Sequence, residues 1–289
     1  MEPPVPLLAS AVMTIDRVLA RKMWRTLEPY HGMIYFVPEA EQEYVSAGLK
    51  PGRMGYFSSR SAAMGPVPGE VVVATFFNFN PDLVHSVIPA AWALASPEQI
   101  LAARFRAADA SLRRLLGDDI DSVELAEAAA LARTATEGEL RPDGRPLYAG
   151  HASLPWPDDP HLVLWHAITL LREYRGDGHI AALVTDGVTG LQALVMHAAS
   201  GDVPADVLRS TRAWSEGEWA DAVTELGRRG WVTADGGFTD EGRAHRQEVE
   251  DRTDDLALAP WNALGPEGCD RLRSLVRPFS KAISERTFR

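Results

Sequence analysis

The feature that most constrains the fold is an internal repeat. The stretch IPAAWALASPEQILAARF at 88–105 resembles LAPWNALGPEGCDRLRSL at 258–275. The shared positions are Trp92 and Trp261, Pro97 and Pro266, and Glu98 and Glu267, and the members of each pair are 169 positions apart. Gly32 and Gly201 keep the same spacing further upstream, and each closes a predicted helix. A repeat of this length indicates two copies of one module in a single polypeptide.

The second copy contains the clearest local pattern, WSEGEWADAVTELGRRGWVTADGGFTDEGR at 214–243. A predicted helix closes on LGRRGWV, a turn and a short return strand follow, and DEGR opens another helix. This order of helix, two-stranded wing and helix is typical of winged helix-turn-helix domains. In the first copy, VVVATFF at 71–77 is rich in β-branched and aromatic residues, which predicts a strand. We therefore expect a mainly α fold of tandem winged-helix-like units with small β-hairpin wings, forming an intramolecular pseudo-dimer.

The composition of the chain suggests where the two units meet. We expect the first winged-helix-like unit at 1–117 and the second at 161–289. The segment 118–160 between them contains a predicted amphipathic helix at 123–138, followed by a connection dense in Pro and Gly. Two units joined in this way leave a cleft between them.

Three blocks of unusual sequence resemble a known family. They are LEPYHGMIYFVPEA (27–40), TFFNFNPDLV (75–84) and LREYRGDGHIAALVTDGVTG (171–190). With these blocks in this order, the chain resembles a family of actinobacterial helix-turn-helix, MarR-like winged-helix proteins, most of them uncharacterised. The resemblance covers nearly the whole chain and implies a cytoplasmic protein containing winged helices. It brings no catalytic residues, and the regulatory role that it implies rests on fold alone.

The charge of the chain disfavours DNA as a partner without excluding it. Phosphate neutralisation supplies most non-specific affinity for DNA, yet the net charge is −11, from 40 acidic and 29 basic residues. Within 215–243 three basic residues face seven acidic ones. The candidate DNA-binding residues are Arg53 and Arg60 in the first unit and Arg228 and Arg229 in the second. Packing or dimer contact is the alternative role of this acidic helix.

The predicted cleft is the expected binding site of a small hydrophobic or aromatic molecule. Its candidate ligand-binding residues are His31, Tyr35, Phe57, Phe77, Phe79, Trp165, His166 and Arg172. The expected outcome of binding is ligand-responsive regulation or sequestration, with a degenerate DNA-reading face.

An enzyme of specialised metabolism is the alternative, and it depends on RGDGH at 175–179. The two glycines are expected to break the helix, placing Arg175, Asp177 and His179 on a tight polar turn. Asp177 would then orient His179 for acid–base chemistry, and Arg175 would bind an anionic group. A structural explanation competes, because Asp177 would also suit the N-cap of a following helix.

The sequence predicts no metal and no cofactor. His161, His166, His179 and His197 lack zinc-ligand spacing, and Cys269 is the only thiol. Dinucleotide-binding, phosphate-loop and hydrolase-elbow motifs are absent. No apolar run is long enough to cross a membrane, and the first residues lack a secretory pattern. We expect a cytoplasmic monomer or homodimer.

Overall fold

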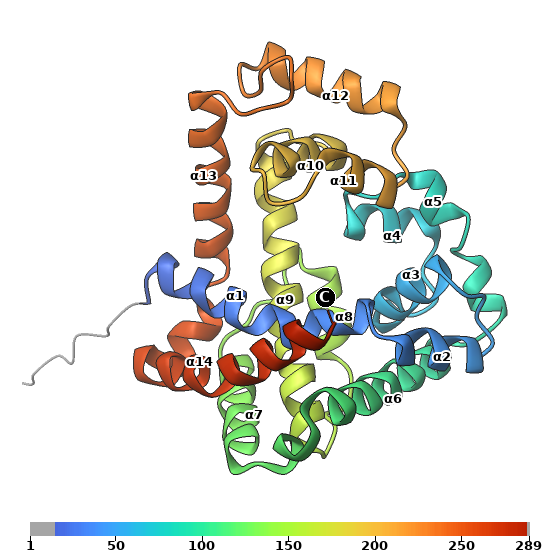
Figure 1. Cartoon of the computed structure of the whole chain (residues 1–289), viewed down its shortest axis with the longest axis vertical. Helices are drawn as coiled ribbons and strands as arrows, with labels where there is room; N and C mark the ends of the chain where they lie inside the picture. Colours follow the sequence, from blue (N-terminus) through green and yellow to red (C-terminus); the bar gives the residue numbers. More distant parts are fainter. Residues whose placement is uncertain (1–14, 288–289) are drawn as a thin grey trace, which may run out of the picture.

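The long helix α9 (Pro160–Thr185) is the element around which the rest of the chain packs (Figure 1). In the computed structural model, which describes residues 15–287, sixteen of its 26 residues are buried. A helix that is buried on most of its circumference lies inside a domain and not on its surface. Helices α1, α6, α7, α8 and α13 all pack against α9.

The described chain is built from helices. In order they are α1 (Arg17–Gly32), α2 (Pro38–Ser46), α3 (Arg53–Ser61), α4 (Gly69–Phe76), α5 (Pro81–His85), α6 (Pro97–Leu116), α7 (Val123–Thr136), α8 (Pro146–Ala152), α9, α10 (Gly190–Ala199), α11 (Ala205–Thr211), α12 (Glu216–Arg228), α13 (Asp240–Leu256) and α14 (Ala259–Thr287). Short 3₁₀ turns lie between several of them. Capping boxes at Ser96, Thr189 and Ser215 begin α6, α10 and α12, because each side chain satisfies an otherwise unpaired backbone N–H.

The two larger apolar cores divide the fold into a main body and an upper lobe. The main body, α1–α9 with α14, contains the larger core, in which Phe57, Leu112 and Trp165 are among the fully buried side chains. The upper lobe, α10–α13, has a smaller core that includes Leu226 and Val249 and the last turns of α9. Figure 1 shows α12 at the outer edge of this lobe, far from α14.

The expectation of β-hairpin wings is wrong. Between residues 15 and 287 there is no β-strand, and the one β-bridge joins Val232 and Phe238. The Thr233 N–H donates to the Gly237 carbonyl at 2.8 Å, which closes a tight turn and not a ladder. The wing that we expected in the second unit is therefore only a turn between α12 and α13.

The strand expected at 71–77 is also wrong, because most of this stretch forms α4. Val72 and Phe76 lie one helical turn apart and are 0% and 5% exposed, so they present one apolar face to the main core. Tertiary burial of this face outweighs the weak strand preference of β-branched residues. The expectation of a mainly α protein is confirmed, whereas winged units are not found.

The duplication, the pseudo-dimer and the unit boundaries stay predictions, because the order of helices alone does not establish them. Residues 1–14 lie outside the described residues. They include the start of the expected first unit and the segment in which we expected no secretory signal. No single described helix is both long and apolar enough to cross a membrane; α9 and α10 meet that test only as a pair bent by 100°.

Candidate functional site

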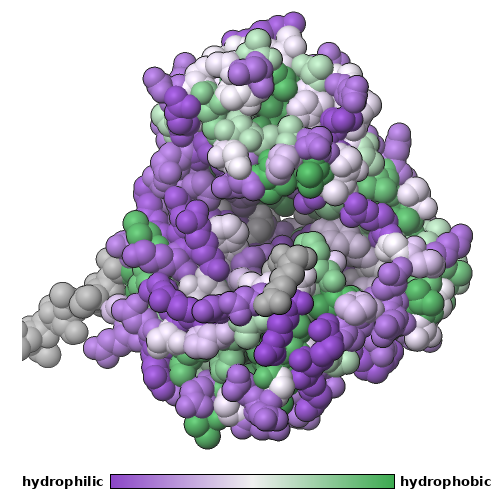
Figure 2. Space-filling view, in the orientation of Figure 1, coloured by the Kyte–Doolittle hydropathy of each residue, from purple (hydrophilic) through white to green (hydrophobic). Residues whose placement is uncertain are grey.

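A cavity of about 310 Å³, the central cavity, lies between the main body and the upper lobe. The main body lines it with residues of α1, α3, α4, α8, α9 and the segment 77–79, and the upper lobe lines it with residues of α10, α13 and the end of α11. Figure 2 shows the surface hollowed between these two parts. A neighbouring side cavity of about 540 Å³ shares Glu28, Tyr56, Phe79, Arg172 and Arg212 with it. Volumes of this size are typical of small-molecule sites.

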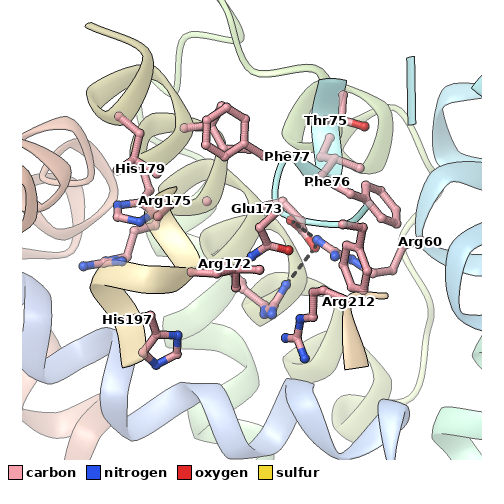
Figure 3. Close-up of a pocket in the computed structure, with 18 of the residues that line it drawn as sticks. Arg60, Thr75, Phe76, Phe77, Arg172, Glu173, Arg175, His179, His197 and Arg212 are labelled. Carbon is pink, nitrogen blue, oxygen red and sulfur yellow. Dashed lines mark hydrogen bonds and ion pairs between the residues drawn. The ribbon is translucent and has the colours of Figure 1, made fainter. Parts of the chain in front are cut away.

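A buried ion-pair network forms one wall of the central cavity. Glu173 of α9 is 2% exposed and accepts hydrogen bonds from Arg60 at 3.1 Å and from Arg172 at 3.1 Å (Figure 3). Arg172 also pairs with Glu28 of α1 at 3.0 Å. Burial opposes ionisation of Glu173, but the charges of Arg60 and Arg172 prevail and lower its pKa to about 2. The network therefore stays ionised and ties α1 and α3 to α9.

Arg212 is a cavity cation that sequence reasoning missed. It follows the last residue of α11 and lines both cavities. Its Nη1 donates to the Thr211 hydroxyl at 2.7 Å, while its Nε is buried without a hydrogen-bond partner. Within residues 15–287 no carboxylate pairs with it, whereas Arg60, Arg172, Arg175 and Arg246 each have one. No local motif marks Arg212, because only the tertiary fold brings α11 to this cavity.

The residues expected to form a catalytic turn lie on a continuous helix. Helix α9 runs through 175–179 without a break, so the predicted turn and the N-cap role of Asp177 are both wrong. Residues two apart on a helix point to nearly opposite sides, which separates Asp177 from His179. Asp177 accepts a hydrogen bond from the backbone N–H of Tyr148 at 2.9 Å and does not line the central cavity. Arg175 and His179 do line it.

Gly178 lies within α9, where it permits the close approach of neighbouring side chains. A Cβ at this position would lie 2.8 Å from Arg145 Nη1 and 3.3 Å from the Leu256 side chain. Burial raises the pKa of Asp177 to about 7, against the opposing hydrogen bond from Tyr148. Glycine therefore serves helix packing here and not helix termination.

The hydrogen bonds of His179 fix its tautomer. The Thr253 hydroxyl donates to the Val249 carbonyl at 2.7 Å, so it accepts from His179 Nδ1, which lies 2.9 Å away. The proton is therefore on Nδ1, and the Nε2 of the neutral ring is an acceptor. Burial lowers the pKa of His179 to about 4, which keeps the ring neutral near pH 7. Arg175 pairs with Glu250 at 3.0 Å on the same side of the cavity.

Of the expected ligand-binding residues, Phe77, Phe79 and Arg172 line the central cavity, and Tyr35 lines the side cavity. Phe57 lies in the main core, where its ring supports Phe79 at a centroid distance of 4.9 Å. His166 is also buried, and its burial lowers its pKa to about 4.

His31 and Trp165 belong to a buried chain of hydrogen bonds. The Thr169 hydroxyl donates to the Trp165 carbonyl at 2.9 Å, so His31 Nδ1 donates to Thr169 at 2.9 Å. His31 Nε2 then accepts from the Tyr35 hydroxyl at 3.0 Å, and Tyr35 accepts from Arg104 at 3.5 Å. Such a fully directed network fixes α1 against α9.

A strained turn carries two of the aromatic groups into the cavity. Phe77 has φ 59° and ψ −51°, a conformation that residues other than glycine rarely adopt. The Asn78 N–H donates to the Phe76 carbonyl at 2.6 Å, which closes a three-residue turn. Trp214 of the upper lobe donates to the Asn78 carbonyl at 3.0 Å, and this contact holds the turn between body and lobe. Sequence reasoning missed Asn78, whose Oδ1 is buried without a partner.

Two of the four candidate DNA-binding residues lie at the cavities. Arg60 is the buried partner of Glu173 and faces the interior. Arg53 lines the side cavity and donates to the Thr211 carbonyl at 2.9 Å. Neither residue lies on α12, the helix that corresponds to the expected reading helix.

The other two candidates lie at the end of α12. Arg228 is exposed and pairs with Glu225 at 3.0 Å. Arg229 donates to the Asp186 carbonyl at 2.6 Å, and its guanidinium stacks 3.8 Å from the centre of the Trp231 ring. The exposed acids of α12 are Glu216, Glu218, Asp221 and Glu225. This surface is acidic, as the sequence indicated.

One group of potential metal ligands occurs in the described part of the chain. The ligand atoms of Asp109, Asp159 and His161 lie within 4.8 Å of one another. His161 Nε2 already lies 2.6 Å from Asp109, which also accepts from Arg113 at 2.9 Å. These contacts explain the geometry without an ion, and we assign no metal to the group.

The comparisons with known proteins place the chain at the level of a family. A helix-turn-helix family model matches residues 20–288. No curated protein and no solved structure matches the chain. The finer relationship to actinobacterial MarR-like proteins stays a prediction. Since the match covers nearly the whole chain, this protein belongs to the helix-turn-helix family, which at a coarse level suggests a DNA-binding regulator.

Proposed function

We propose that this protein is a ligand-responsive member of its family and binds a small molecule in the central cavity. One observation carries the proposal. Four residues of the cavity wall have a buried polar atom without a hydrogen-bond partner: Arg60 Nε, Asn78 Oδ1, Arg175 Nε and Arg212 Nε. Buried polar groups in native proteins nearly always have partners, so a molecule in the cavity would supply the missing ones.

The position of the cavity supports a regulatory role. Arg60 and Arg172 reach it from the main body, while His197, Arg212 and Arg246 reach it from the upper lobe. A ligand that contacts both parts favours the relative position of body and lobe in which it makes the better contacts. The upper lobe contains α12, so this helix moves with it. A bound molecule would therefore bias the position of α12 by its differential contacts.

The enzyme alternative receives no support from this geometry. Asp177 and His179 lie on different sides of α9, and each already has its own hydrogen-bond partner. His179 and Arg175 contribute to the proposal as cavity-lining, ligand-binding residues.

An uncharged aromatic compound, N-phenyl-1-naphthylamine, tests the proposal through its fluorescence. We expect saturable binding of one molecule per chain. Ala193→Phe, which fills the cavity from α10, should abolish this binding, and Ala198→Phe on the same helix should preserve it. Far-UV circular dichroism and thermal melting establish that both variants fold. Equal binding to both variants would place the ligand elsewhere.

Direct DNA reading is the second candidate function, and family membership favours it. The acidic face of α12 argues against it, because phosphate contacts need Lys or Arg. We expect a fluorescently labelled duplex at 50 mM salt to bind more weakly than about 10⁻⁴ M, the weak limit of ordinary non-specific binding. Tight binding to the upstream region of its own gene would establish DNA reading and require a different basic surface.

A further inference from the structure

We propose that the ligand is an aromatic carboxylate whose anionic group pairs with Arg212. This inference rests on the proposed function and adds the chemical class of the molecule. Its starting point is one guanidinium group that has no carboxylate partner among the described residues. Arg212 Nη1 donates to the Thr211 hydroxyl, whereas Nε is buried and unpartnered and Nη2 donates to no described residue.

Nη2 of Arg212 is the donor left for a carboxylate, because it donates to no described residue. A hydrogen bond from a guanidinium to a carboxylate is charge-assisted and stronger than one between neutral groups. Arg212 lies at the boundary between the central and side cavities, which it lines together with Arg172 and Phe79. The other four arginines of the central cavity are already neutralised by carboxylates of the protein. The unmatched positive charge is therefore at Arg212.

A second unpaired cation strengthens the site. Arg53 lines the side cavity, and the same residue, Thr211, holds both arginines through its carbonyl and its hydroxyl. No described carboxylate forms an ion pair with Arg53 either. Burial and the charge of Arg53 lower the pKa of Arg212, although Tyr56 opposes them. Two neighbouring cations without an anion repel each other, and a bound carboxylate removes that repulsion.

The aromatic part of the ligand follows from the rings beside Arg212. The Arg212 guanidinium lies over the Phe79 ring, 5.2 Å from its centre. Tyr56 packs against Phe79 with ring centres 5.5 Å apart, and Phe77 lines the central cavity from the strained turn. Flat rings packed in this way favour an aromatic group through offset or edge contacts. The two cavities, of about 310 and 540 Å³, hold a ligand of one or two rings.

The test compares 2-naphthoate with its uncharged amide, 2-naphthamide, by titration calorimetry of the full chain. We expect the wild-type protein to bind the carboxylate at least about 10-fold more tightly, the typical effect of hydrogen bonds to a charged group. Arg212→Gln should weaken naphthoate binding by about 10- to 100-fold and change naphthamide binding by less than about 2-fold. Arg209→Gln, one turn earlier on α11 and paired with Glu216, is the matched control and should leave both affinities unchanged.

The possible failures are distinguishable. Equal affinity for the two compounds, or unchanged naphthoate binding by Arg212→Gln, would overturn the carboxylate inference while the small-molecule function stands. If neither compound nor N-phenyl-1-naphthylamine binds, the proposed function falls and this inference falls with it. The wild-type preference decides the matter even if Arg212→Gln does not fold, and Arg53→Gln then provides a second variant, with an expected loss of about 3-fold for naphthoate alone.

Discussion

The wall of the central cavity and the exposed face of α12 differ in both charge and pairing. Five arginines line the cavity, and four of them are held by carboxylates at fixed distances. On α12, four acids are exposed, and Arg228, the last residue of the helix, forms a surface pair with Glu225. The arginines of the cavity wall are therefore enclosed and mostly paired, whereas the exposed face of α12 is acidic.

This difference separates what the family name suggests from what the side chains can do. A helix-turn-helix scaffold positions α12 at the edge of the upper lobe, but affinity for phosphates depends on surface charge. The interior arginines, by contrast, lie in a setting of low dielectric, where each interaction with a charge is stronger. The comparison therefore predicts that charge changes have large effects in the cavity wall and small effects on α12.

The largest expected effect is that of Glu173→Gln. It removes the shared carboxylate of Arg60 and Arg172 without changing side-chain size, and leaves a buried cation poorly compensated. We expect the free energy of unfolding, measured with urea, to fall by about 3–5 kcal/mol. The matched change on α12, Glu225→Gln, should cost less than about 0.5 kcal/mol. Similar losses in the two variants would contradict the comparison.

The helical character of this fold is predictable from the sequence because caps and apolar spacing act locally. Ser96, Thr189 and Ser215 are each followed three residues later by Gln or Glu, a pattern that indicates the start of a helix. Each of them is found as a capping residue. The prediction of a strand at 71–77 was wrong. These residues suit a helix or a strand, and the packing of Val72 and Phe76 against the main core decides in favour of a helix. The prediction of a turn at 175–179 was wrong for a similar reason. Glycine at position 178 leaves room for the side chain of Arg145, which lies 33 positions earlier in the sequence.

The candidate site was predictable only in part. Phe77, Phe79 and Arg172 were expected at a cleft, and the structure places them at the central cavity. Arg212 and Asn78 were not anticipated, because their importance comes from what they lack. An unpaired polar atom is a property of a tertiary environment, and no spacing or composition in the sequence reports it.

The second prediction concerns Asp177, an acidic residue buried in the interior. Burial raises the pKa of Asp177 to about 7, so the folded protein holds a proton that the unfolded chain releases near pH 4. Stability from this group is therefore present below about pH 4 and is lost as the pH rises through 7. Asp177→Asn removes that loss and keeps an acceptor for the Tyr148 N–H. Relative to wild type, its free energy of unfolding should rise by on the order of 2 kcal/mol between pH 5 and pH 8.

Urea denaturation at several pH values measures this difference. A difference between Asp177→Asn and wild type that does not change with pH would show that the carboxyl group is ionised throughout the range. In that case the interior would tolerate an unpaired anion as easily as the surface of α12 does, and the contrast between the two regions would weaken.

The smallest expected effect is that of Arg212→Gln in the ligand-free protein, and its sign is opposite to that of Glu173→Gln. The substitution removes a half-buried cation that has no carboxylate and lies near Arg53. Its free energy of unfolding should rise by less than about 1 kcal/mol, whereas Arg172→Gln, which breaks pairs with Glu28 and Glu173, should lower it by about 2 kcal/mol or more. Because the gain comes from relieved repulsion at a partly exposed site, it should shrink in 0.5 M salt. A large loss of stability in Arg212→Gln would mean that this arginine holds the fold together as its paired neighbours do, and the cavity wall would then contain no charge reserved for a ligand.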